Sequence, residues 1–216
     1  MILRILRPAR HAGWLALLAS CAAAIACNGN QPPAAQAYVD ATIGSGAQVI
    51  GLCNFAGPRQ TVVGIGVATG NDPTRVKDGD TQSGSYQAHI SCTVTPSGNG
   101  FDVSLNATLE GPQGGSLTIQ SPPGQGTVTT SGASGVTGVF QAANSGSYRE
   151  KDCTIAYTYN GGPVPDSPPI AAGRIWGHIS CPTATDSSQT TNGPDGGPSD
   201  VECDGEADFL FEQCAQ

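Results

Sequence analysis

The chain has 216 residues, of which 9 are basic and 17 acidic, and charged residues make up only 12% of the sequence. The formal net charge of −8 leaves no basic excess for binding nucleic acid or an anionic membrane surface. The composition therefore predicts no nucleic-acid partner.

Residues 1–26 are organised like a bacterial export signal. Arg4, Arg7 and Arg10 form a basic stretch, and residues 14–26 are an uncharged apolar run. This run is too short for a comfortable transmembrane helix and ends among small residues. These features resemble bacterial lipoprotein signal peptides, in which a short box of small apolar residues ends at the cysteine that becomes acylated. The resemblance implies a membrane anchor made of acyl chains such as palmitate.

Two cysteines compete for the lipid. Cys21 ends the stretch LASC, which fits the box better than the stretch AIAC that ends at Cys27. The residues after Cys27, NGNQPPAAQ, are polar and suit a flexible tether, whereas those after Cys21 are apolar. Acylation of Cys27 also leaves six cysteines, an even number that can all pair, whereas acylation of Cys21 leaves seven. We predict lipidation of Cys27, with Cys21 as the alternative.

Cleavage before Cys27 would divide the chain into a signal peptide (1–26), a flexible tether (27–39) and a single β domain (40–216). The exported part has six basic and 17 acidic residues, a net charge of −11. A chain of about 190 residues can form one domain that buries roughly 70% of its unfolded surface. Disulfides would therefore reinforce a core rather than replace one.

From residue 40 onward, short runs of alternating apolar and polar residues are separated by clusters of Gly, Pro, Asn and Ser, as is typical of all-β domains. The clearest run is FDVSLNATL at 101–109, in which alternate residues are apolar. We expect an antiparallel β-sandwich or open barrel with long loops rich in Gly and Pro. The other predicted strands are 48–55, 61–68, 116–120, 136–141 and 153–159.

The connections can be predicted from the same sequence. PSGNG at 96–100 is typical of a tight hairpin turn. Residues 160–169 and 182–200 are rich in turn-forming residues and predict long irregular loops. The C-terminal residues 205–214, GEADFLFEQC, fit both a strand and a helix. We favour the strand, because the rest of the exported chain offers no helix to pack beside it.

The stretch His-Ile-Ser-Cys occurs twice, at residues 89–92 and 178–181. In a strand, residues three apart point to opposite faces, so neither histidine can form a dyad with the cysteine of its own copy. We predict that Cys92 and Cys181 lie on the apolar face and that His89 and His178 lie on the polar face. Two imidazoles alone make an incomplete metal site, so we predict no metal and no cofactor. A site shared by His89 and His178 is the alternative, and it requires that their strands be neighbours.

Six cysteines lie in the predicted β domain, and we expect all of them to form disulfides: Cys53, Cys92, Cys153, Cys181, Cys203 and Cys214. Cys181 ends one predicted strand and Cys203 precedes the next, so a bridge between them would close the loop at 182–200. The remaining four cysteines allow three connectivities. We predict Cys53 with Cys92 and Cys153 with Cys214.

No motif in the chain specifies a reaction, because it has no nucleophile elbow, phosphate-binding loop or zinc-binding helix motif. The lipobox, the polar tether, the short strands and the ending CDGEADFLFEQC together resemble uncharacterised lipoproteins of Gram-negative bacteria such as the myxobacteria, most specifically in the signal. Neither Ala22 nor Asn28, which follow the two candidate cysteines, is the aspartate that retains lipoproteins at the inner membrane, so the resemblance implies the outer membrane. We expect a non-enzymatic binding or structural domain with an envelope protein or glycan as its partner. The alternative is a carbohydrate-active hydrolase that uses a carboxylate pair.

Overall fold

The computed structural model describes residues 32–45, 53, 59–82, 85–112, 114–143, 146–192 and 198–216, with the backbone alone at 187–192 and 198–200. The described residues belong almost entirely to one unit, Ala34–Gln216. Both predicted lipidation sites, Cys21 and Cys27, lie outside the described residues, as does the predicted strand 48–55 apart from Cys53.

The predicted all-β antiparallel fold is confirmed. One antiparallel sheet runs in the order β2-β1-β14-β13-β9-β8-β7-β6-β5-β4, with β3 paired to β1 and β12 paired to β13, while β10 and β11 form a separate hairpin. The strands are β1 (Gln36–Ser45), β2 (Arg59–Ile65), β3 (Val76–Lys77), β4 (Thr81–Gln82), β5 (Tyr86–Ser97), β6 (Gly100–Glu110), β7 (Ser116–Gln120), β8 (Ala133–Gln141), β9 (Ser147–Ala156), β10 (Thr158–Tyr159), β11 (Gly162–Pro163), β12 (Ile170–Ala171), β13 (Arg174–Asn192) and β14 (Pro198–Glu212). Among the described residues there is no helix that is long and apolar enough to cross a membrane.

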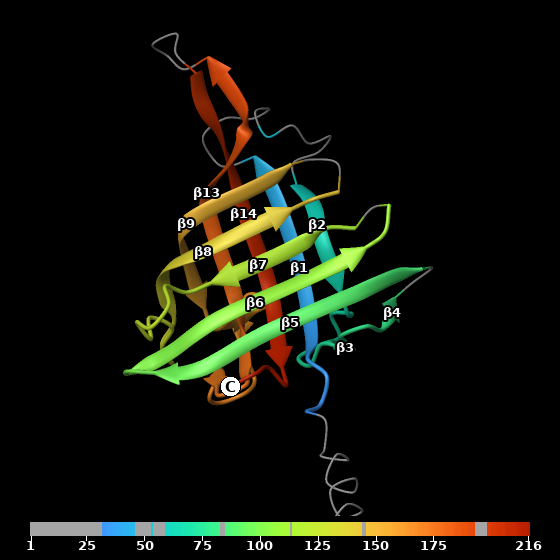
Figure 1. Ribbon diagram of the computed structural model, residues 1–216, viewed down its shortest axis with the longest axis vertical. Coiled ribbons are helices and arrows are strands. Elements are labelled where there is room, and N and C mark those ends of the chain that lie inside the picture. Colours follow the sequence, from blue (N-terminus) through green and yellow to red (C-terminus); the bar gives the residue numbers. More distant parts are fainter. Residues whose placement is uncertain are drawn as a thin grey trace, which may run out of the picture. The chain divides into compact units, whose positions relative to one another are not determined.

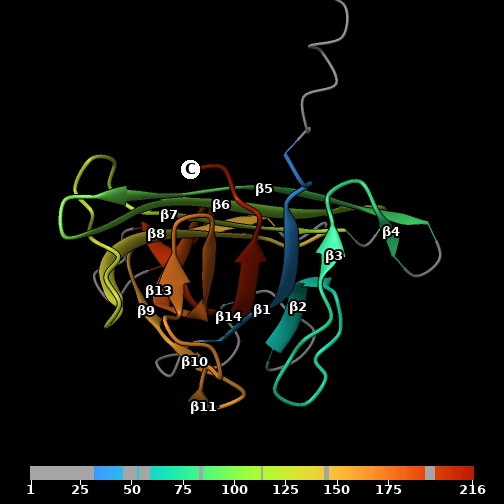
Figure 2. The ribbon, with the colours of Figure 1, turned by 90° about the horizontal axis from the view of Figure 1, so that it is seen from below.

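The sheet folds back on itself to form two layers. Strands β5 to β8 cross steeply over β13, β14, β1 and β2 (Figure 1), and the view from below shows the first group edge-on above the second (Figure 2). Strand β9 pairs with both β8 and β13 and so joins the layers. The core lies between them because alternate residues of each strand point inward. Its largest fully buried side chains include Phe140, Tyr148, Phe209 and Phe211.

A side chain links the two ends of the sheet, and the C-terminal segment links β14 to β5. The amide of Gln82 in β4 accepts a hydrogen bond from the Gly66 backbone N–H at 3.0 Å, next to strand β2. The backbone N–H of Ala215 donates a hydrogen bond to the Cys92 carbonyl, and the Ala215 carbonyl accepts one from the Val94 N–H. A disulfide between Cys92 and Cys214 fixes this segment to β5. The result is a barrel-like sheet that is nearly closed.

Three boundaries differ from the sequence prediction. Strand β1 begins at Gln36, and Ala37 and Tyr38 are buried, so ordered structure starts before residue 40. The predicted loop at 182–200 is instead mostly strand, because β13 and β14 continue past the two layers as a two-stranded ribbon (Figure 1). The predicted loop at 160–169 contains the short strand β11, which pairs with β10. The C-terminal segment is a strand, as we favoured, since β14 runs to Glu212.

Disulfide bonding is confirmed, but the predicted connectivity is wrong. The bridges are Cys53–Cys203, Cys92–Cys214 and Cys153–Cys181. The proposed Cys181–Cys203 bridge fails because Cys181 does not end its strand. Cys203 pairs in register with Ala184, whereas Cys181 lies across from Cys153 of its other neighbour β9, with 4.5 Å between their Cα atoms.

Candidate functional site: two aligned bulges beside a disulfide

The two repeated His-Ile-Ser-Cys stretches lie in β5 and β13. Cys92 and Cys181 are buried, whereas the His89 and His178 side chains are 44% and 28% exposed, so the predicted division between faces is confirmed. Strands β5 and β13 are not paired, and the structure therefore does not bring the two imidazoles into one site. Each histidine instead meets a carboxylate of an adjacent strand.

His178 belongs to a row of polar side chains on the outer face of β13, β14 and β1. Its Nδ1 lies 2.8 Å from the Asp208 carboxylate, and Asp40 faces Asp208 across the next pair of strands. The hydrogen bond to Asp208 raises the pKa of His178. Burial, followed by the nearby charge of Asp208, raises the pKa of Asp40. The hydrogen bond to Asp208 thus holds His178 in place on the outer face. The Nε2 atom of His89, on β5, lies 3.3 Å from the carboxylate of the exposed Glu110.

A small aromatic cluster also covers part of this outer face. Trp176 shares the face of His178, which predicts exposure, yet it is only 1% exposed. Trp176 packs beneath the β10–β11 hairpin. The centroid of the Tyr159 ring lies 5.4 Å from that of Trp176 and 5.8 Å from that of Tyr38. Leu210 completes the cluster. The alternation in β13 could not reveal this burial, because the covering hairpin comes from another part of the chain.

The more unusual local geometry lies beside the Cys153–Cys181 disulfide, where β9 and β13 each contain an extra residue. Glu150 of β9 pairs with Gly138 of β8, and Cys153 pairs with Val136. Between these two pairs β9 advances by three residues and β8 by two. Strand β13 likewise advances three residues, from Cys181 to Ala184, while β14 advances two. Bulges of this kind turn side chains in new directions and are over-represented near functional sites. Here two bulges lie side by side, and a disulfide holds them together.

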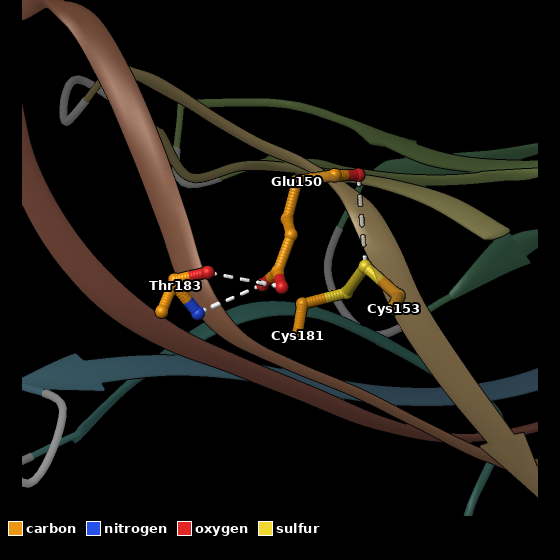
Figure 3. The surroundings of a disulfide bond; sticks show 4 residues. All are labelled: Glu150, Cys153, Cys181 and Thr183. Atoms are coloured by element: carbon orange, nitrogen blue, oxygen red, sulfur yellow. Dashed lines mark hydrogen bonds between the residues drawn. A yellow bond between two sulfur atoms is a disulfide. The ribbon is translucent and has the colours of Figure 1, made fainter. Parts of the chain in front are cut away.

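The bulges open the ladder between the two strands. Paired residues of β9 and β13 stop at Ser180 and resume at Thr185. In the gap the Glu150 carboxylate accepts a hydrogen bond from the Thr183 backbone N–H at 2.8 Å and another from the Thr183 hydroxyl at 3.0 Å (Figure 3). The side chain of Glu150 thus replaces part of the missing backbone ladder.

A polar hollow of about 560 Å³ lies at this opening. Its lining combines cations, carboxylates and hydroxyls from both strands. It is formed by Ser147, Arg149, Glu150, Lys151, Thr183, Thr185 and Asp186. Asp186 is only 4% exposed, the most deeply buried charged side chain among the described residues. The hollow is within the usual size range of small-molecule sites.

One grouping of potential metal ligands lies beside the hollow. Glu150 lies close to the sulfur atoms of Cys153 and Cys181, a grouping of potential ligands. Those sulfur atoms are joined to each other in a disulfide, however, whereas a cysteine binds a metal as a free thiolate. The lining of the hollow can hold a polar ligand by hydrogen bonds and charge.

Two further hollows are less suited to a charged ligand. One of about 600 Å³ lies along the edge of β2, lined mainly by residues 60–64 with Tyr86 and Leu109. The other, of about 300 Å³, lies beside Asp102. The Asp102 carboxylate accepts hydrogen bonds from the Gly126 and Gly124 backbone N–H groups, and the Gly126 bond in particular lowers its pKa. Asp102 therefore anchors its own neighbouring turn.

Sequence reasoning missed the hollow between β9 and β13, although one signal was present. Tyr148 and Cys153 are both buried, but they are five residues apart and would point to opposite faces of a regular strand. The intervening REKD therefore had to contain a bulge.

No family model, curated protein or solved structure matches the chain.

Proposed function

We propose that the protein is a lipid-anchored, extracytoplasmic envelope protein whose β domain binds a ligand rather than catalysing a reaction. The export signal and the candidate acylated Cys27 support the anchor. The anchor would hold the domain at the outer membrane of a Gram-negative envelope, with an envelope glycan or protein as the partner.

The observation that carries this proposal is the pairing of all six cysteines of the domain in three disulfides. Such bridges persist in oxidising compartments and are rare in the cytosol of most organisms. They agree with the N-terminal signal, which is an independent feature of the chain. The binding role is supported by the polar hollow, whose Glu150 is already engaged by the backbone and hydroxyl of Thr183.

Mass spectrometry of the N-terminal peptide from the native host tests the anchor. We expect the mature chain to begin with an acylated Cys27. A lipidated peptide that begins at Cys21 would move the anchor to the alternative site and retain the proposal. An unmodified N-terminus would overturn the anchored location.

A glycan hydrolase is the second candidate, because Glu150 and Asp186 line the same hollow. A hydrolase needs one carboxyl to act as an acid and another to act as a base or nucleophile. Incubation with envelope polysaccharides, followed by measurement of new reducing ends, separates the two functions. Binding without new ends supports the proposed function, whereas cleavage that Glu150→Gln abolishes would establish the hydrolase.

A further inference from the structure

We propose that the hollow between β9 and β13 binds an acidic sugar unit, in which a carboxylate or phosphate group meets Arg149 and Lys151 while sugar hydroxyls meet Glu150 and the hydroxyl side chains of the lining. This inference rests on the proposed binding function, since it names the ligand class and the site.

The first observation concerns which basic side chains of the domain form ion pairs. Three arginines of the domain, Arg59, Arg75 and Arg174, are each paired with two carboxylates. Arg149 and Lys151 form no ion pair with any residue that the structure describes, and both line the same hollow. In a domain with a net charge of −11, two uncommitted cations at one hollow provide a localised attraction for an anion.

The remaining lining indicates that the anion is part of a hydroxyl-rich molecule. The carboxylates of Glu150 and Asp186 would repel a bare anion. Each Glu150 oxygen accepts one hydrogen bond from Thr183 and has a second lone pair that can accept another from a sugar hydroxyl. The hydroxyls of Ser147 and Thr185 can either donate or accept, whereas the Thr183 hydroxyl, which donates to Glu150, can accept. An acidic sugar satisfies both halves of this lining, whereas an inorganic anion or a neutral sugar satisfies only one.

The local architecture holds the site in place. The bulge of β9 contains Lys151, and the bulge of β13 contains Thr183. The Cys153–Cys181 disulfide and the Glu150–Thr183 hydrogen bonds connect the two strands beside the hollow (Figure 3). A ligand would therefore meet a backbone and a Glu150–Thr183 pair that are already positioned, which lowers the ordering cost of binding.

The test measures binding to the full chain in detergent by calorimetry. The probes are a tetramer of glucuronic acid, a neutral glucose tetramer, glucose 6-phosphate and inorganic phosphate. We expect the glucuronic acid tetramer to bind at least tenfold more tightly than the neutral tetramer. Raising the salt concentration should weaken this binding, because exposed charges are screened. Tighter binding of glucose 6-phosphate than of the glucuronic acid tetramer would indicate a phosphorylated sugar, within the same ligand class.

Matched variants locate the site. Arg149→Ala and Lys151→Ala should each weaken glucuronic acid binding at least fivefold. Lys77→Ala is the control, because Lys77 is an exposed cation that also forms no ion pair with a described residue and lies outside the hollow. Its affinity should stay within twofold of the wild type. All three side chains are exposed, and an unchanged melting temperature would show that each variant folds.

Three results would overturn the inference: no binding of either acidic sugar, equal binding of the neutral tetramer, or an equal loss in Lys77→Ala. Inorganic phosphate that binds as tightly as the acidic sugars would also overturn it, because the site would then recognise any anion. These failures are distinguishable from failure of the proposed function. A lipidated N-terminus together with retention of another envelope component would leave that function standing.

Discussion

At Gly138 the backbone of β8 passes directly beneath the Cys153–Cys181 disulfide. A Cβ atom at this position would lie 2.5 Å from the Cys181 sulfur and 2.9 Å from the Cys153 sulfur. Both sulfur atoms are fixed by their bond to each other, so neither can easily move aside. Glycine is thus required here by close packing rather than by backbone conformation.

We expect Gly138→Ala to lower the free energy of unfolding by about 1–3 kcal/mol, the usual cost of overpacking a core. Urea unfolding of the oxidised protein measures the change. The control is Gly64→Ala in β2, where nothing lies within 4 Å of the added methyl group, and it should be neutral or slightly stabilising. Equal stability of the two variants would show that the disulfide leaves room for a methyl group at position 138.

The His178–Asp208 contact predicts a pH dependence of stability. Asp208 raises the pKa of His178 in the folded state, so the charged imidazole favours folding. This contribution is complete below the unfolded pKa of about 6.5 and is lost as the pH rises through the higher folded value. Relative to His178→Gln, the wild type should lose stability between pH 5.5 and 9, as measured by urea unfolding. A difference that does not change with pH would contradict the linkage.

Among the elements, the C-terminal segment has an effect out of proportion to its length. Residues 213–216 follow β14, yet Cys214 and Ala215 join that strand to β5 of the opposite layer. The Gly173 N–H also donates to the Val94 carbonyl, and the Cys214 N–H donates to the Gly173 carbonyl. One bend of the chain thus connects three segments that are distant in sequence.

Replacing Cys92 and Cys214 together by alanine should lower the free energy of unfolding by about 2–5 kcal/mol, as expected for loss of a native disulfide. Amide hydrogen exchange should also become faster at Val94 and Gly173, whose bonds the bridge supports. Exchange measured by NMR provides the check. Protection at Ile155 in β9, a strand that β8, β7 and β6 separate from β5 in the sheet, should fall only as far as global stability does. A larger loss there would mean that the closure is not local.

Strands with one apolar face could be predicted from the sequence, and those without one could not. Residues 101–109 alternate between apolar and polar, and β6 contains them all. Residues 182–200 contain Thr, Ser, Gln and Gly in place of an apolar stripe, so nothing local distinguished the β13–β14 ribbon from a loop. The hollow was missed for a related reason. Arg149 and Thr183 are 34 residues apart, and only the pairing of β9 with β13 brings them together.

For the whole molecule, the disulfide connectivity can be tested with one protease. Trypsin cleaves after Lys and Arg, and the last such residue is Arg174, so Cys181, Cys203 and Cys214 remain on one peptide. The observed bridges link this peptide to three others, those containing Cys53, Cys92 and Cys153. We expect a single four-peptide species by non-reducing mass spectrometry. Two separate linked species would instead match the connectivity predicted from the sequence.

The same three bridges impose an order in time. Each joins one of the three earlier cysteines to one of the three later ones, since Cys53, Cys92 and Cys153 all precede Cys181. A ribosome makes the chain from its N-terminus, so no native bridge can form until residue 181 has been added. Until then the three earlier thiols can pair only wrongly. Cys153–Cys181 can close first, and Cys92–Cys214 must wait for almost the last residue of the sequence.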